Sequence, residues 1–532
     1  MHWEFVCGAC HSMKIRTIHF FTALLCLSAV TASAQAQIPK AKADTLAPRA
    51  PEGTAACSAT ETSSCEVAAA KILPLVMGPS PLEGNLRRLT DEVGGRVTGT
   101  PQMKKAVEWA VAAFRAAAVD VHTEKYVLPV QWSEGETRLE LLGAVQFPVH
   151  LVSTGWSPAL PPGGLEANLV YVRDGSEEDF ARAGTIRGAV LLVRSEIGAS
   201  WADLFNEYMR PPEIIARALK GGAAAILWTG ARERTLLYRH TNSLLGEVDK
   251  IPQAVVARED ALRLARVATA DRKLRVRFSM PNRIGGPIEQ ENVVGEIRGR
   301  EKPDEVVILG AHLDSWELGT GALDNGCNAA LVIEAARAIK ATGLVPRRTI
   351  RFILFSGEEQ GTVGSYEYVK SHRREMDKIR GMITVDAGIG RITGFSLGGR
   401  RDIEAGVREV LKPLDAWGAT QHTPDASFGT DNFDFMLEGV PTLVANQEIS
   451  NYLVNYHAAS DTFDKVDIRE LKINTALAAV AAWGIADRAE PIGKRLSRAE
   501  LDALVKETGL DQQMKILGYW EAWRSGQRGR SR

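Results

Sequence analysis

The second half of the chain alternates short apolar runs with stretches in which apolar residues recur at helical spacing. Residues 306–311, 349–355 and 383–385 are mostly apolar at consecutive positions, which predicts parallel strands buried on both faces. Residues 329–340 and 469–486 have the spacing of helices that cover such a sheet. We therefore expect an α/β fold built on a doubly wound mixed sheet.

The pattern changes between residues 150 and 283, where short strand-like runs alternate with glycine-rich turns. A predicted helix at residues 212–219 leads through a Gly-Gly turn into an apolar strand. This order predicts an inserted β-rich domain, with a variable lid as the alternative. The main domain then comprises residues 76–149 and 284–490, and residues 491–532 are expected to form a C-terminal helical extension.

The amino-terminal pattern predicts a targeting signal. Two basic residues precede an apolar run at residues 20–30, and small residues ending at Ala34 or Ala36 offer a cleavage site. We expect residues 1–36 to be a secretory signal peptide, with Met13 as an alternative start, and the mature protein to be secreted or periplasmic. The apolar run is shorter than the roughly 20 residues that a membrane span needs, so no span is predicted.

Two further segments lie outside the predicted domains. Residues 37–75 are rich in Ala, Thr, Ser and Glu, which predicts a linker or propeptide. Export to an oxidising compartment would allow Cys57 and Cys65 to form a disulfide, and the sequence does not decide whether they pair. At the other end, the second of two predicted helices spans residues 512–524, and the basic residues 524–532 predict a solvated tail.

Composition agrees with a large folded protein. The chain has 532 residues, of which 45% are hydrophobic and 24% are charged, enough to bury one large or two medium cores. The formal net charge is -1, and no cluster of Lys and Arg is interleaved with aromatic residues. The basic footprint of a nucleic-acid-binding protein is therefore absent from the sequence.

Acidic and imidazole side chains stand at the ends of all three predicted strands: His312 and Asp314, then Glu358 and Glu359, then Asp386. Active sites of open α/β sheets form at the carboxyl ends of strands.

Asp324, which precedes the helix at residues 329–340, and His457 complete this set of side chains. Carboxylates and imidazoles without a thiolate suit Zn²⁺ or a similar cation.

Five segments carry a resemblance to a known family: AHLDS, GALDNG, FSGEEQGTVGSYEY, TVDAG and YHAASDTFDKV. They resemble peptidase family M28, the di-zinc exopeptidases, and the layout over residues 82–487 is similar to its carboxypeptidase Q (plasma glutamate carboxypeptidase) branch. The resemblance implies a zinc-peptidase-like, phosphorylase/hydrolase-like sheet whose insertion at residues 150–283 is a protease-associated (PA) domain. It also implies a cis peptide bond between Asp324 and Asn325.

The resemblance further assigns metal ligands. It implies two Zn²⁺ ions per chain, with Asp324 bridging them. One ion would be held by His312, Asp324 and Asp386, and the other by Asp324, Glu359 and His457.

Two further residues receive catalytic roles from the resemblance. Asp314 would orient the His312 imidazole, as metal-bound histidines require. Zinc lowers the pKa of water, and Glu358 would take the proton as general base and return it to the departing amine. We expect a zinc exopeptidase, either an aminopeptidase or a dipeptidase, that hydrolyses short peptides with a free amino terminus.

Two other functions are weighed against this one. A glutaminyl-peptide cyclase uses the same fold with one zinc, and a receptor-like binding protein keeps the fold without catalysis. The complete set of ligands and the presence of Glu358 argue against both. The preferred amino-terminal residue of the substrate and the assembly state, including a homodimer, stay open.

Residues near these segments carry secondary predictions. We expect Cys327 to be a buried residue that packs like a small hydrophobe, in preference to a metal ligand. We expect Asp461 to be a turn or cap residue, and the alternative is that it supports the imidazole of His457. His422 is predicted to assist an oxyanion or to satisfy a loop, and Tyr452 and Tyr456 to shape a pocket or to pack.

Overall fold

The structure is a computed structural model that describes residues 59–244 and 246–531. The predicted signal peptide (residues 1–36) and Cys57 lie outside the described residues. None of the helices in these two ranges is both long enough and apolar enough to cross a lipid bilayer.

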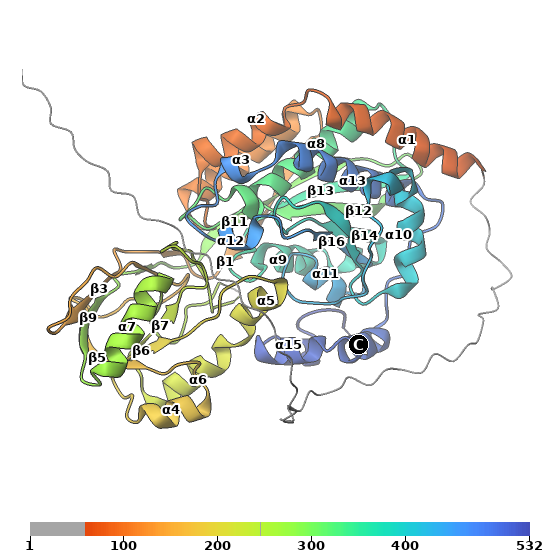
Figure 1. Ribbon diagram of the computed structural model, residues 1–532. Helices are drawn as coiled ribbons and strands as arrows, with labels where there is room; N and C mark the ends of the chain where they lie inside the picture. Colours follow the sequence, from red (N-terminus) through yellow and green to blue (C-terminus); the bar gives the residue numbers. More distant parts are fainter. Residues whose placement is uncertain (1–58, 245, 532) are drawn as a thin grey trace, which may run out of the picture. The chain divides into compact units, whose positions relative to one another are not determined.

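A seven-stranded mixed sheet forms the core of the domain that the sequence resemblance predicts to be the peptidase domain (Figure 1). Its strands are, in sheet order, β1 (Asp120–Leu128), β11 (Ile288–Ile297), β13 (Arg348–Phe355), β12 (Lys302–His312), β14 (Ile379–Thr384), β16 (Thr442–Gln447) and β15 (Ile392–Ser396). The four strands β13, β12, β14 and β16 run parallel, and the remaining pairs are antiparallel. The predicted α/β class with a mixed sheet is therefore confirmed.

Both faces of the central strands are buried. In β12, Val307 and Leu309 pack on one face, whereas Val306 and Ile308 pack on the other. Each such side chain contributes about 1.5–3 kcal/mol on burial, which explains why the strand sequences are continuously apolar. One face is covered by α3 (Pro101–Ala116), α8 (Cys327–Ala341) and α13 (Ile468–Asp487), and the other by α9 (Val363–Ser371) and α11 (Phe433–Leu437).

A helix occupies part of the range predicted as a linker or propeptide. α1 (Ala59–Met77) packs against α8 and α13, and its Ile72 and Val76 are fully buried. The low complexity of residues 37–75 concealed the apolar face of α1, which packs Ala68, Ala69 and Ile72 into the core.

A second seven-stranded mixed sheet is built entirely from residues between β1 and β11 (Figure 1). Its strands are, in sheet order, β3 (Arg138–Leu142), β9 (Arg275–Ser279), β5 (Leu165–Tyr171), β6 (Val190–Val193), β7 (Ala225–Thr229), β8 (Gln253–Val256) and β4 (Leu151–Ser153). It carries the helices α4 (Glu177–Ala183), α6 (Pro211–Gly221) and α7 (Arg258–Ala270). The inserted domain is thus mixed α/β, with more helix than the β-rich pattern predicted.

The insertion begins earlier than its predicted boundary at residue 150. β3 was expected in the peptidase domain, but it pairs with β9 in the second sheet. Where the chain enters and leaves this sheet, β2 (Trp132–Ser133) pairs with β10 (Arg283–Ile284). We therefore define the insertion as residues 132–284.

The C-terminal extension is tied to the peptidase domain. It forms α14 (Arg498–Glu507), α15 (Leu510–Ile516) and α16 (Trp520–Ser525), so the single helix predicted at residues 512–524 is interrupted. The chain turns there at Gly518, whose φ is 83°. The predicted solvated tail is wrong at Arg528, which is 2% exposed and binds both carboxylate oxygens of buried Asp434 at 2.7 Å.

Replacing Arg528 by Met should destabilise the protein by about 3–5 kcal/mol, because the Asp434 carboxylate is left buried without its partner. Urea unfolding followed by circular dichroism measures the loss. The matched control is Arg524→Met, because the Arg524 side chain is 62% exposed and pairs with the exposed Glu521 at the surface. Its cost should stay within about 1 kcal/mol, and equal losses in the two variants would contradict a buried pair.

Candidate metal centre

The predicted strand ends are neighbours in space, because β12 lies between β13 and β14 in the sheet. His312 is the last residue of β12. Glu358 and Glu359 lie in the loop that follows β13, and Asp386 lies just beyond β14. Parallel strands bring their carboxyl ends to one edge, so these side chains converge there.

Two loops bring the remaining residues to the same edge. Asp324 lies in the segment η2 (Ala322–Gly326), where its own backbone is not helical, and its peptide bond to Asn325 is cis, as predicted. The Asp461 carboxylate accepts the backbone N–H groups of Leu323 at 2.7 Å and Asp324 at 3.1 Å. Asp461 therefore holds the turn that carries Asp324, in line with its prediction as a turn residue.

The Asp324 carboxylate lies between two imidazoles. Its Oδ1 is 3.2 Å from His312 Nε2, and its Oδ2 is 3.3 Å from His457 Nε2. On the outer sides, Asp386 Oδ1 is 3.0 Å from His312 Nε2, and Glu359 Oε2 is 2.9 Å from His457 Nε2. The structure thus brings the five predicted ligands together as two triplets that share Asp324.

The hydrogen bonds of the two histidines leave Nε2 directed at the carboxylates. His312 Nδ1 donates to the Asp314 carbonyl at 3.0 Å, and His457 Nδ1 donates to the Arg239 carbonyl at 3.0 Å. An unprotonated Nε2 and a carboxylate oxygen are both acceptors, so a proton or a cation must lie between them.

The spacing of these atoms fits a metal ion. Two ligands of one tetrahedral zinc, each about 2.0–2.1 Å from it, lie about 3.3 Å apart. Glu359 Oε1 is buried and has no hydrogen-bond partner among the described residues. The donor set therefore fits divalent cations.

The electrostatics of the cluster also call for positive charge. Burial lowers the pKa of His457, but Glu359 and Asp324 more than offset this and raise it to about 9. Burial raises the pKa of Glu359 to about 7 and that of Glu358 well above its ordinary value. The protein thus holds protons where a bound cation would take their place.

Asp314 contacts the loop that carries Glu358 and Glu359 with its side chain. The carboxylate accepts Thr98 Oγ1 at 3.0 Å and the backbone N–H groups of Glu358 and Glu359 at 3.3 and 3.4 Å. Its carboxylate oxygen is 3.6 Å from His312 Nδ1, whereas its carbonyl is the hydrogen-bond acceptor. Asp314 therefore orients the imidazole through its main chain and the glutamate loop through its side chain.

A cavity of about 340 Å³ opens onto this cluster. Four carboxylates and both histidines of the cluster line it, and Tyr456 stacks on the His457 ring at 3.7 Å. The rest of the lining is largely apolar or aromatic: Trp201, Leu204, Phe205, Met209, Leu244, Phe428, Val444, Tyr208 and Tyr452. Among the described residues of this lining, none is Lys or Arg.

One wall of the cavity is the helix α5 (Trp201–Met209) of the insertion. Its lining residues Trp201, Leu204, Phe205 and Tyr208 have the i, i+3, i+4, i+7 spacing of one helix face. None of the nine residues of α5 is fully buried, and this face lines the cavity. The sequence analysis missed this helix, although its apolar spacing was a usable signal.

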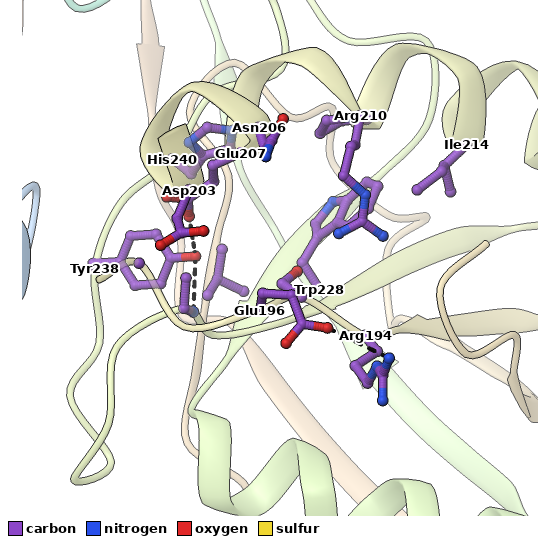
Figure 2. A pocket seen from close by; sticks show the side chains of 15 residues that line it. Arg194, Glu196, Asp203, Asn206, Glu207, Arg210, Ile214, Trp228, Tyr238 and His240 are labelled. Atoms are coloured by element: carbon purple, nitrogen blue, oxygen red, sulfur yellow. Dashed lines mark hydrogen bonds and ion pairs between the residues drawn. The ribbon is translucent and has the colours of Figure 1, made fainter. Parts of the chain in front are cut away.

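The opposite face of α5 lines a second, smaller cavity of about 90 Å³ (Figure 2). Asp203 and Glu207 reach it from α5 and Arg210 from the residue after this helix, and His240 faces it with neither ring nitrogen hydrogen-bonded within the described residues. Burial lowers the pKa of His240 to about 4, so the imidazole is neutral. This cavity is too small for a peptide, which leaves the larger one as the candidate site.

Two secondary candidates lie outside the cluster. Cys327 is fully buried and its thiol contacts the carbonyls of Leu323 and Gly388, as expected for a small hydrophobe. His422 packs on Phe395 and accepts its backbone N–H at 3.2 Å, which is the loop contact predicted as its alternative.

Comparison with known proteins gives a consistent result. Residues 292–482 match peptidase family M28. Carboxypeptidase Q of Xenopus laevis is 30% identical over 437 residues, covering 81% of this chain and 92% of the relative. Carboxypeptidase Q of Mus musculus is 29% identical over 409 residues, covering 76% and 85%.

Solved structures share the fold. A peptidase M28 precursor from Shewanella amazonensis SB2B has a TM-score of 0.74 at 28% identity, covering 82% of this chain and 99% of that chain. A zinc aminopeptidase from Bacillus subtilis has a TM-score of 0.62 at 18% identity, covering 78% and 97%.

A mixed α/β sheet with this cluster at its edge, in a chain with these relatives, defines a hydrolase of the metallo-exopeptidase class. The chain belongs to peptidase family M28.

Proposed function

We propose that this chain is a zinc-dependent aminopeptidase that removes residues from short peptides with a free amino terminus. The observation that carries the proposal is the pair of triplets sharing Asp324, with Nε2 of His312 and of His457 each facing two carboxylates at 2.9–3.3 Å. His312, Asp324 and Asp386 would hold one Zn²⁺, and Asp324, Glu359 and His457 a second. The zinc aminopeptidase that shares the fold supports this choice of metal.

Glu358 is the group that moves protons in this proposal. When bound, zinc polarises the scissile carbonyl and lowers the pKa of water. Glu358 lines the cavity next to the ligand Glu359 and is held in place by the Asp314 carboxylate. Bound cations would favour the ionised form of Glu358, in which it accepts the proton of the attacking water and returns it to the departing amine.

The charges of the cavity support recognition of the amino terminus of a peptide. Of its four lining carboxylates, Asp324, Glu359 and Asp386 would hold zinc, which leaves Glu358 to attract an ammonium group. The described lining residues include no Lys or Arg that could pair with the terminal carboxylate of a peptide substrate. The apolar wall from α5 favours a hydrophobic side chain beside the scissile bond.

The proposal also includes export of the enzyme and a protease-associated character of the insertion. The pattern of residues 1–36 supports an exported enzyme, secreted or periplasmic. The helix, glycine turn and strand of the insertion support its resemblance to a protease-associated domain.

Glu358→Gln should retain two zinc ions and lose about 100- to 10,000-fold in kcat, because only the proton acceptor is removed. Asp324→Ala should lose zinc as well as activity, because both triplets lose their shared carboxylate. Elemental analysis of the purified proteins and steady-state kinetics separate the two effects. Glu178→Gln, an exposed site on α4, is the control; zinc loss in Glu358→Gln equal to that in Asp324→Ala would reverse the assigned roles.

Blocking the amino end of a substrate should abolish turnover, while blocking its carboxyl end should not. We expect acetyl-Leu-Leu to be at least about 100-fold poorer in kcat/KM than Leu-Leu, since buried polar groups reject a substrate that cannot pair with them. Leu-Leu-amide should remain within about tenfold of Leu-Leu. Strict dependence on a free carboxylate would refute the aminopeptidase assignment in favour of a dipeptidase or carboxypeptidase.

The same assays test the alternative functions. Cyclisation of peptides that begin with Gln would identify a cyclase, and binding of peptides without turnover at saturating zinc would identify a binding protein. Both activities should be absent or minor beside hydrolysis, and chelation followed by zinc return should abolish and restore hydrolysis.

A further inference from the structure

A short segment of the insertion lies beside the loop that carries His457. The backbone N–H of Arg239 donates to the His457 carbonyl at 2.9 Å, and the N–H of Ala459 donates to the Leu237 carbonyl at 3.0 Å. Tyr238, which lines the small cavity in Figure 2, forms an antiparallel bridge with Ala458. Residues 237–239 and 457–459 thus form a miniature two-stranded ladder between the insertion and the peptidase domain.

This ladder fixes both the backbone and the side chain of His457. The residue has a φ of 59°, a left-handed conformation that is strained for a non-glycine residue and persists only when its surroundings hold it. Its Nδ1 donates to the Arg239 carbonyl at 3.0 Å, which leaves Nε2 for Asp324 and Glu359. The acceptor that sets the tautomer of this histidine therefore comes from the insertion.

The Arg239 side chain anchors the ladder. It is fully buried, and its guanidinium binds Glu134 at 2.7 Å, Glu317 and the Ser153 carbonyl. Burial raises the pKa of Glu134, but Arg239 more than offsets this and holds it below its usual value. Glu317 belongs to the loop after β12 in the peptidase domain, so Arg239 is clamped from both domains.

We propose that Arg239 is a positioning residue for the His457 side of the metal centre, and that the insertion is a structural part of that centre. The inference rests on the proposed binding of two zinc ions. The guanidinium fixes residues 237–239, these residues fix His457, and His457 then presents Nε2 to the cation it shares with Glu359 and Asp324. The triplet of His312, Asp324 and Asp386 has no such dependence on Arg239.

The test measures zinc affinity and stoichiometry of the full chain in zinc-buffered solution. Arg239→Met should bind one zinc as tightly as the unmodified protein and the second about 10–100-fold more weakly, the usual effect of losing support for a metal ligand. Arg239→Lys keeps the charge, so its affinity for the second zinc should lie between those of Arg239→Met and the unmodified protein. Arg272→Met, on the exposed surface of the insertion, should bind both ions normally.

Double variants identify which ion is affected. Arg239→Met combined with His457→Ala should lose no more zinc than His457→Ala alone, because both changes act on one site. Arg239→Met combined with His312→Ala should weaken both sites. Circular dichroism and unfolding midpoints of the metal-free proteins check folding. If Arg239→Met does not fold, Arg239→Lys tests the positioning role instead, because it leaves neither Glu134 nor Glu317 without a cation.

The outcomes separate this inference from the proposed function. Two zinc ions bound with unchanged affinity in both Arg239 variants would overturn the positioning role, as would equal weakening of both ions. Absence of zinc from the unmodified protein at saturating concentration would instead overturn the proposed function.

Discussion

The carboxylate of Asp324, placed between two imidazoles, is the interaction on which the site depends. Its oxygens lie 3.2 and 3.3 Å from the Nε2 atoms of His312 and His457. Glu359 and Asp386 close the cluster on either side, and all of these side chains are withdrawn from water. Buried carboxylates need a compensating positive charge. The cluster therefore fits bound cations, and the surrounding structure has to hold five side chains at fixed separations.

The sheet meets this requirement through burial of its central strands on both faces. A shift of one residue in β12 would exchange the side chains of Val307 and Leu309 with those of Val306 and Ile308, and the helix layers on each face oppose it. The register of β12 against β13 and β14 is thereby fixed, and with it the position of His312 relative to the two neighbouring loops. The packing of β12 side chains away from the site therefore sets the distances between His312 and the other residues of the cluster.

Segments outside the peptidase domain complete the cavity. The insertion contributes the apolar face of α5 and the carbonyl of Arg239 that holds His457. The C-terminal extension supports Phe428 on another wall, where the Tyr519 ring lies 5.3 Å from the Phe428 ring and Gln513 accepts its backbone N–H at 3.1 Å. The buried pair of Arg528 and Asp434 secures this extension. The walls of the cavity are therefore shared by parts of the chain that lie hundreds of residues apart.

Local patterns of the sequence determined the α/β class, the strands that end near His312 and Asp386, and the set of side chains that meets at the sheet edge. These features follow from residue type and apolar spacing, which act over a few neighbouring positions. Only the tertiary structure decided that β3 belongs to the insertion, that Arg528 is buried, and that a backbone carbonyl supports His457. Strand pairing depends on distant partners, and every residue has a carbonyl group, so no local pattern distinguishes the one that the folded chain uses.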